Sequence, residues 1–153
     1  MKGKVVSFVL LGIALAACQR SINYTHQEKY FFLKNGILYY KGDPFEGELV
    51  RYFENGQLKE KGNYLEGLNE GPWEAYFENG QLAREGKFSA GKEEGLWKSY
   101  DQYGKPAYHG NYKGGKEEGW WEIYTDGVIQ RKVLYNNGEV IKGETFDKQE
   151  IVE

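Results

Sequence analysis

The sequence has 153 residues, enough for one domain of ordinary size, and it contains 21 Gly, 13 Tyr, 8 Phe and 4 Trp against 3 Pro. This composition is typical of many short strands joined by tight turns, and not of packed helices. The formal net charge is −3, with 20 basic and 23 acidic residues interspersed. Nucleic-acid binding has no support, because it requires Lys and Arg clustered on one face.

The first 17 residues have the pattern of a targeting segment. Lys2 and Lys4 precede an almost wholly apolar run from Val5 to Ala17. This run is shorter than the about 20 residues that a permanent transmembrane helix needs. The pattern therefore indicates an export signal that does not belong to the folded domain.

The targeting segment ends in Leu15-Ala16-Ala17-Cys18, which resembles the lipobox of bacterial lipoproteins. The resemblance implies that residues 1–17 are a cleaved signal peptide and that Cys18, the single cysteine, carries the lipid. In that family an Asp after the cysteine signals retention at the inner membrane. Gln19 stands there instead, which implies the outer-membrane route if the host is Gram-negative. The expected location is the bacterial cell envelope, with membrane contact through the lipid on Cys18.

A polar stretch and a short apolar run follow the cysteine. Residues 18–29 carry no hydrophobic period and are expected to form a tether between the lipid and the folded body. The run Tyr30–Leu33 ends at Asn35-Gly36, and a shortened copy of the repeat described next continues to Gly47. Because a terminal repeat has a neighbour on one side only, this copy is expected to cap the N-terminal end.

A repeat of constant length organises the chain from residue 30 to residue 143. Its opening glycine recurs every 24 residues, and whole columns recur with it: Gly47/Gly71/Gly95/Gly119, Leu49/Trp73/Trp97/Trp121, Tyr52/Tyr76/Tyr100/Tyr124, Gly56/Gly80/Gly104 and Gly62/Gly86/Gly110. Each repeat is predicted to be one β-hairpin, so the fold class is all-β, an elongated single-layer antiparallel β-meander. Residues 144–153 are expected to form a C-terminal cap or tail.

Two kinds of connection alternate along the repeats. Asn55-Gly56 and Asn79-Gly80 predict type I′ turns, because Asn and Gly tolerate positive φ values. The other connection is read as Gly-Lys-Glu-Glu-Gly at Gly91–Gly95 and Gly115–Gly119.

The first kind of turn predicts the strand register. The expected cross-strand pairs are Phe77 with Leu82, Ala75 with Arg84, Trp73 with Gly86, Trp97 with Gly110 and Leu49 with Gly62. A glycine opposite a large aromatic leaves room for the indole. Because side chains alternate, two faces are expected: Trp73, Phe77, Leu82 and Phe88 on one, and Glu74, Tyr76, Glu85 and Lys87 on the other.

The pattern Gly-x-Trp-x-x-Tyr-x-x-Asn-Gly-x-Leu, followed by Gly-x-Phe-x-x-Gly, resembles the variant form of the MORN repeat from about Gly36 to Gly143. The resemblance implies a single-layer sheet built from hairpins. Some bacterial proteins of this type are labelled as antitoxins, and other MORN proteins are linked with membrane or protein scaffolding. The departures are Leu49 for Trp, Tyr103 for the turn Asn, Pro106 for Leu and Lys132 for Gly.

The sequence predicts no catalytic residue, no cofactor and no metal. His26 in the tether and His109 within a repeat are read as surface or packing residues, and zinc lacks a His pair or a Cys partner at ligand spacing. The acidic pairs Glu93-Glu94 and Glu117-Glu118 could align carboxylates for calcium. A lysine beside each pair favours solvated turns instead.

Two aromatic columns remain as functional candidates. The column Trp73, Trp97 and Trp121, with Gly62, Gly86 and Gly110, is expected to be structural. The column Tyr52, Tyr76, Tyr100 and Tyr124, with copies about 10 Å apart, suits an extended peptide or a sugar chain but also suits packing. We expect a lipid-anchored, non-enzymatic protein that binds a protein partner at the envelope. Polysaccharide binding through the aromatic face and antitoxin-like neutralisation are the alternatives, and export argues against a cytosolic toxin.

Overall fold

The fold is described from a computed structural model, in which residues 21–146 can be described. The expected signal peptide, Cys18 and residues 147–153 lie outside these residues. The strands are β1 (Ser21–Asn23), β2 (Phe31–Lys34), β3 (Ile37–Tyr40), β4 (Asp43–Pro44), β5 (Gly47–Tyr52), β6 (Leu58–Leu65), β7 (Leu68–Tyr76), β8 (Leu82–Ser89), β9 (Lys92–Tyr100), β10 (Pro106–Lys113), β11 (Lys116–Thr125), β12 (Val128–Asn136) and β13 (Glu139–Thr145). The helices are α1 (Tyr24–Gln27) and the 3-10 helix η1 (Glu28–Tyr30). Within residues 21–146 no helix is long and apolar enough to cross a membrane.

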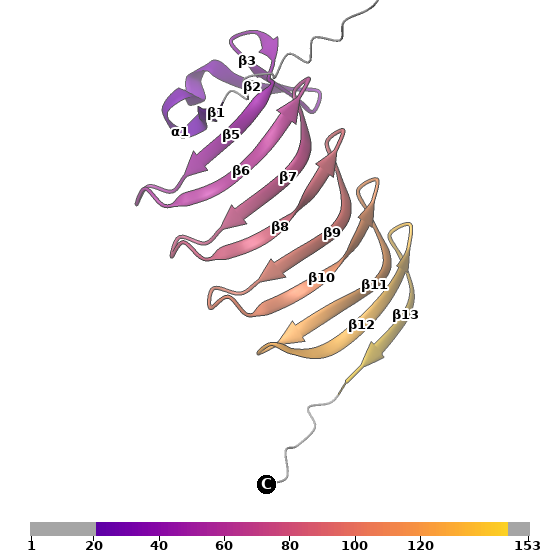
Figure 1. The fold of residues 1–153 in the computed structure, drawn as a ribbon. Helices are drawn as coiled ribbons and strands as arrows, with labels where there is room; N and C mark the ends of the chain where they lie inside the picture. The colour runs from indigo at the N-terminus through magenta and orange to yellow at the C-terminus, as the bar shows by residue number, and fades with distance from the viewer. Residues whose placement is uncertain (1–20, 147–153) are drawn as a thin grey trace, which may run out of the picture.

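One curved sheet of ten strands makes up most of the described chain (Figure 1). From β5 to β13 each strand pairs antiparallel with the next one in sequence. The hairpins lie side by side in one layer, and the sheet does not close on itself (Figure 1). The predicted all-β, single-layer meander of hairpin repeats is confirmed.

The expected tether at residues 18–29 is wrong where the structure describes it. Residues 21–23 form β1, which pairs parallel with β5, and α1 follows directly. Ile22 is only 3 % exposed, and Tyr24 packs against the same buried cluster, so these two side chains anchor the polar stretch to the folded body. The spacing of apolar residues does not predict this contact, because it forms between Ile22 and a strand that is distant in the sequence.

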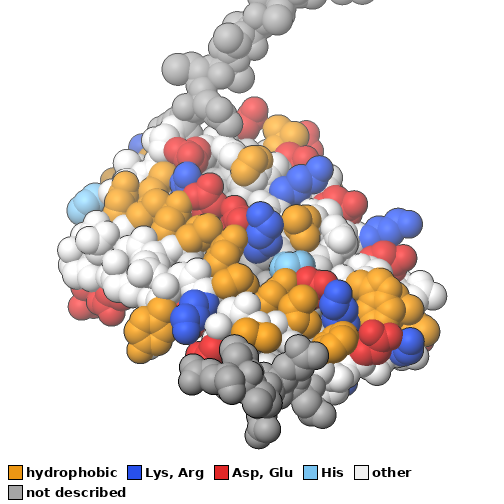
Figure 2. All heavy atoms as spheres, turned by 60° about the horizontal axis from the view of Figure 1, so that its bottom comes forward, with side chains coloured by type: hydrophobic (Ala, Val, Ile, Leu, Met, Phe, Trp, Pro, Cys, Tyr) orange, Lys and Arg blue, Asp and Glu red, His pale blue; other side chains and the backbone are white. Residues whose placement is uncertain are grey.

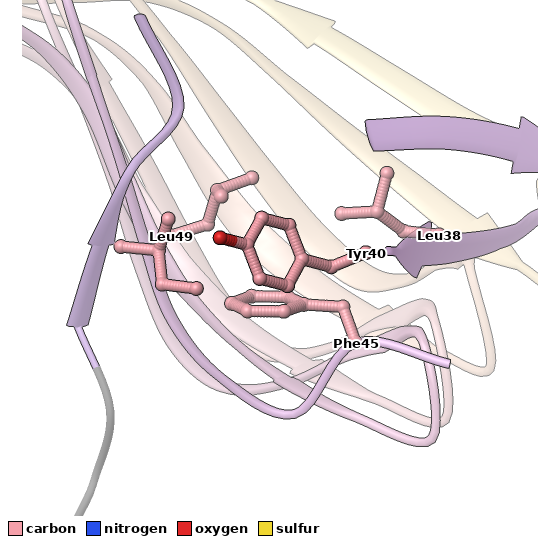
Figure 3. Close-up of a cluster of buried hydrophobic side chains, with 5 residues drawn as sticks. Leu38, Tyr40, Phe45 and Leu49 are labelled. Carbon is pink, nitrogen blue, oxygen red and sulfur yellow. The ribbon is translucent and has the colours of Figure 1, made fainter. Parts of the chain in front are cut away.

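The N-terminal end of the sheet carries the largest buried cluster. Strands β2, β3 and β4 form a three-stranded sheet that is separate from the main sheet. The buried cluster is Ile22, Leu38, Tyr40, Phe45 and Leu49. Figure 3 shows Tyr40 and Phe45 directed toward Leu49, with Leu38 beside them. The shortened copy therefore lies over the end of the repeats as predicted, but as a second layer and not as another hairpin of the sheet.

The predicted pairing of large side chains with glycines is confirmed in the register. Trp73 lies opposite Gly86, and Trp97 lies opposite Gly110. Leu49 lies opposite Gly62 in the same way.

The indole that covers each glycine belongs to the following repeat. A Cβ on Gly86 would stand 2.2 Å from the ring of Trp97, and a Cβ on Gly110 would stand 2.2 Å from the ring of Trp121. Gly62 is covered likewise by Trp73, at 2.6 Å. Each indole therefore packs on the glycine of the preceding hairpin, which couples successive repeats.

The fourth hairpin, β11 and β12, has a different turn and a different residue opposite its tryptophan. Asp126-Gly127 shortens its turn, so that Val133 and not Lys132 lies opposite Trp121. Lys132 is therefore not the equivalent of Gly86, which corrects the sequence alignment. No fifth tryptophan follows in the sequence, and Val133, 2 % exposed, fills the space that an indole takes elsewhere.

The turns at Asn55-Gly56 and Asn79-Gly80 differ from the predicted type I′. Gly80 has a φ of 85°, whereas Asn79 is not among the residues with positive φ. The Gly80 N–H donates to the Phe77 carbonyl at 2.9 Å, and the Phe77 N–H donates to the Gln81 carbonyl at 2.8 Å. This is a type I turn followed by a glycine bulge. It pairs Tyr76, and not Phe77, with Leu82.

The same geometry explains why Tyr103 replaces the turn Asn in the third repeat. Only the last turn position needs positive φ, and Gly104 supplies it with a φ of 81°. Two-residue turns with positive φ at both positions lie at the other edge, for example at Ala90-Gly91, and also at the shortened turn Asp126-Gly127 of the fourth hairpin. The predicted five-residue connections at Gly91–Gly95 and Gly115–Gly119 are therefore wrong, because β9 begins at Lys92 and β11 at Lys116.

Candidate binding surface

The tryptophan face of the main sheet is a packed surface. Trp97 is 0 % exposed and Trp121 is 6 % exposed, while Trp73 is half-buried. The Trp97 ring centroid lies 5.6 Å from that of Trp73 and 5.0 Å from that of Phe88. The Arg84 guanidinium lies over the Trp97 ring at 4.4 Å. Trp97 and Trp121 are therefore buried in this face, and their indoles offer little surface to a ligand.

The tyrosine face carries the second predicted column, and three of its hydroxyls hold carboxylates. The Tyr100 hydroxyl donates to Glu85 at 2.8 Å, and the Tyr124 hydroxyl donates to Glu122 at 2.8 Å. The Tyr76 hydroxyl donates to Glu74. These bonds fix the position of each ring along the sheet.

Tyr52 differs from the other members of the column. Its ring is 38 % exposed, and Val50 occupies the position that Glu74 has relative to Tyr76. Its main-chain N–H donates to the Thr25 hydroxyl on α1 at 3.1 Å. The column therefore consists of three anchored tyrosines and one at the N-terminal end beside α1.

A line of basic side chains pairs with the same carboxylates. The ion pairs on this face are Lys61–Glu74 at 2.9 Å, Lys98–Glu85 at 3.3 Å and Lys132–Glu122 at 2.6 Å. The His109 Nε2 atom also lies 2.9 Å from a Glu122 carboxylate oxygen. His109 therefore has an acidic partner from the neighbouring strand, as a packing residue would, whereas His26 is exposed on α1. Cross-strand register alone creates these pairs, so a column-by-column reading of the sequence missed them.

The pKa values of three column tyrosines and of Glu122 are shifted away from neutrality. Burial and the hydrogen bond to Glu122 raise the pKa of Tyr124 to about 12. Burial and the neighbouring carboxylates also raise the pKa of Tyr76 and Tyr100. The hydrogen bonds from Lys132 and Tyr124 lower the pKa of Glu122. At neutral pH these tyrosines are therefore neutral phenols and Glu122 is a carboxylate.

A second column on the tyrosine face consists of exposed apolar residues. Pro72, Leu96 and Trp120 each precede a column tryptophan, and alternation turns them to the opposite side. Leu96 is 49 % exposed and Trp120 is 42 % exposed. The 24-residue spacing could have revealed this column, but the residue types differ from copy to copy. Figure 2 shows hydrophobic side chains in separate groups among charged ones on the side of the molecule that it views.

Three hairpins of this sheet match a known repeat family. The MORN repeat variant matches residues 45–66, 69–90 and 93–113. This chain carries MORN repeats of the variant type. The hairpin of β11 and β12, with its shortened turn, lies beyond the matched residues.

Two further comparisons concern the whole chain. No curated protein matches the sequence. Among solved structures, the crystal structure of the GtfA/B complex bound to UDP and GlcNAc is similar, with a TM-score of 0.38 and 10 % identity over 75 % of this chain. The match spans 23 % of the length of that chain.

Successive MORN repeats are also joined through their acidic residues. Carboxylates that follow one turn at this edge accept main-chain N–H groups from the next turn at the same edge: Glu70 from Ala90 at 2.7 Å, Glu94 from Gly114 at 2.9 Å and Glu118 from Asn137 at 2.9 Å. Glu93 pairs with Arg84 at 2.8 Å. Among the described residues no group of three or more His, Cys, Asp or Glu is placed to hold a metal ion. Of the acidic pairs considered from the sequence, Glu93, Glu94 and Glu118 therefore bind the protein's own turns or arginine and are not simply solvated.

Proposed function

We propose that this chain is a lipid-anchored, non-enzymatic repeat protein that binds a protein partner at the bacterial envelope through its tyrosine face. The observation that carries the proposal is the pair of columns on that face. Leu96 and Trp120 expose apolar surface, and Tyr76, Tyr100 and Tyr124 stand beside them in fixed positions. Apolar anchors surrounded by paired charges are typical of protein interfaces.

A protein partner suits this face better than a polysaccharide does. Sugar rings stack on exposed aromatic faces, but Trp97 and Trp121 are buried. The tyrosine rings are half-buried, except for Tyr52. Between them the face exposes ion pairs, the aliphatic Leu96 and the ring of Trp120. This mixture matches the side chains of an extended polypeptide better than it matches a row of sugar rings. An antitoxin-like role would be a special case, in which the partner is a toxin that acts in the envelope.

The titration of the tyrosine face supports a non-enzymatic role. A general acid or base works best with a pKa near the operating pH. Here the pKa of Glu122 is lowered and that of Tyr124 is raised to about 12, so both groups move away from neutrality. Such shifts favour fixed ion pairs and hydrogen bonds over proton transfer.

The start of the folded body bears on the proposed anchor. Strand β1 begins at Ser21, three residues after Cys18. Three residues span at most about 10 Å. A lipid on Cys18 would therefore hold the N-terminal end of the sheet close to the membrane surface, without a long tether. Mass spectrometry of the mature N-terminus tests the anchor, and an unmodified Cys18 in the processed protein would remove it.

The binding proposal is tested with two surface variants and a matched control. Leu96→Glu and Trp120→Glu place a charge in the apolar column, while Leu65→Glu changes a leucine of the same 49 % exposure near the turn between β6 and β7. We expect the first two to weaken capture of an envelope partner by at least about tenfold and the control to leave it unchanged. Equal capture by all three variants would contradict the proposal.

The contributions of the tyrosine rings and of their hydroxyls to partner binding are measured with separate variants. Replacing Tyr76 and Tyr100 together with Ala should weaken binding by at least about 1–2 kcal/mol, and the outer Tyr52 and Tyr124 should cost less. The matched Tyr→Phe pair keeps the rings and loses the bonds to Glu74 and Glu85. A Tyr76/Tyr100→Ala protein that melts lower yet binds its partner unchanged would make the column a packing feature. Binding to isolated peptidoglycan instead of protein would favour the polysaccharide alternative.

A further inference from the structure

Within residues 21–146 the C-terminal end of the main sheet has no further strand. Strand β13 pairs with β12 on one side and is the last strand in the sheet order. Val140 and Ile141 are each 58 % exposed, and Phe146 is 41 % exposed. An unpaired edge with exposed apolar residues is a template for another strand.

The main-chain groups that face outward can be identified. The Phe146 N–H donates to the Gln130 carbonyl at 2.7 Å, so the polar groups of Phe146 point toward β12. In an antiparallel ladder, alternate residues direct both their N–H and C=O to the same neighbour. Glu144 and Lys142 therefore also face β12, and Gly143 and Thr145 face away from it.

We propose that this edge pairs with β13 of a second copy of the chain, antiparallel, about a two-fold axis at Gly143. In this register Gly143 lies opposite Gly143 of the second copy, and their outward N–H and C=O groups bond reciprocally. Lys142 then lies opposite Glu144 of the second copy, and Glu144 lies opposite Lys142 of the second copy. Both side chains are on the tyrosine face and form an ion pair at 2.7 Å within one chain. The dimer adds two cross-strand pairs of opposite charge.

Neighbouring symmetric registers are disfavoured by charge. A two-fold axis at Lys142 would place two lysines opposite each other, and an axis at Glu144 would place two carboxylates opposite each other. A bulge at Ile141, where Leu134 pairs with Lys142 and Tyr135 pairs with Val140, limits the regular ladder on the other side. The axis at Gly143 satisfies both the charges and the direction of the main-chain groups.

The proposal is tested by complementary charge reversal in the full chain, purified in mild detergent. Lys142→Glu creates two acidic pairs across the axis, and Glu144→Lys creates two basic pairs. Each variant alone should dimerise at least about tenfold more weakly than the unchanged chain. A mixture of the two should dimerise again, because each Glu then faces a Lys. The pair within each chain stays broken in both variants, so restored folding cannot account for this result.

A disulfide at the axis gives a second measurement. With Cys18→Ser, Gly143→Cys should cross-link two copies under oxidation, because residues paired in this way have Cα atoms about 5.5 Å apart. Glu139→Cys is the control, since its two copies would be more than about 20 Å apart. A monomer by sedimentation velocity at tens of micromolar, dimers insensitive to both charge variants, a mixture that stays monomeric, or equal cross-linking at both positions would each overturn the proposal. A monomer would also be the result if the C-terminal tail of the same chain covers the edge.

Discussion

The two ends of the sheet differ in how they are finished. At the N-terminal end, β1 and a second small sheet enclose Ile22, Leu38, Tyr40, Phe45 and Leu49 (Figure 3). At the C-terminal end, β13 has no buried residue, and its outer edge carries exposed Val140 and Ile141. A repeat protein needs an atypical unit at its ends, because an internal repeat buries its surface only between two neighbours.

This difference shows that an array of repeats can be terminated in two ways. The N-terminal end replaces the missing neighbour with a different structure from the same chain. The C-terminal end adapts the repeat itself: the turn shortens, and Val133 fills the place of the missing indole. That adaptation completes the packing of the face but leaves the main chain of the last strand unpaired. The open edge is therefore a consequence of having no partner segment within the described chain.

The largest effect is expected from the capped end. Phe45 is 3 % exposed and contacts the rings of Phe31, Tyr40 and Tyr64. Phe45→Ala should lower the free energy of unfolding by about 3–5 kcal/mol, because it leaves a cavity in the main buried cluster. Urea denaturation measures it, and a loss below about 1 kcal/mol would show that the cap contributes little stability.

The coupling between internal repeats is tested at a glycine. Gly86→Val should displace the Trp97 indole and cost about 1–3 kcal/mol, as overpacking does. Gly143→Val is the control at the open end, where a Cβ would meet only the guanidinium end of the long Arg131 side chain, at 3.3 Å. Gly143→Val should lower the free energy of unfolding much less than Gly86→Val does. Trp97 fluorescence that is unchanged in Gly86→Val would contradict the assignment of the indole to the following repeat.

A smaller effect is expected from the tyrosine hydroxyls. Tyr124→Phe should cost about 0.5–1.5 kcal/mol, because it removes the hydrogen bond to Glu122. Tyr52→Phe is the matched control, because Val50 stands where Glu122 stands relative to Tyr124, and its effect should be near zero. Thermal melting of both variants at neutral pH measures the difference. Equal losses would show that the carboxylate contact does not stabilise the fold.

The pH dependence of stability follows from the same pairs. The pKa of Tyr124 is raised to about 12, so its contribution is fully present below the ordinary tyrosine value of about 10 and is lost as the pH rises through about 12. The pKa of Glu122 is lowered, so its contribution is present above about 4.5 and is lost on further acidification. Tyr124→Phe should therefore flatten the alkaline decline, and an unchanged decline would exclude Tyr124 as its cause.

The smallest effect is expected at the open end. Val140 is 58 % exposed, so Val140→Ala should change the free energy of unfolding of the monomer by less than about 0.5 kcal/mol. Denaturation at submicromolar concentration isolates the monomer. A larger loss there would mean that this end is covered within the same chain, and the contrast with Phe45 would then disappear.

The sequence by itself determined the repeat, the hairpins and the Trp–Gly register. These follow from local rules: a constant spacing, turn residues and the two-residue alternation of a strand. The same rules could not identify the turn type at Asn79-Gly80, because a type I turn with a glycine bulge and a type I′ turn both accept Asn-Gly. That choice decided whether Tyr76 or Phe77 pairs with Leu82.

Only the tertiary structure decided which residues meet across repeats. The Trp97 indole covers Gly86 and not its register partner Gly110, because the large ring extends over the preceding hairpin. Ile22 is buried although its segment is polar, because β1 lies against β5. His109 meets Glu122 because strand pairing places them opposite each other. Such contacts join residues that are distant in sequence and depend on side-chain size and strand curvature, which no spacing within one repeat records.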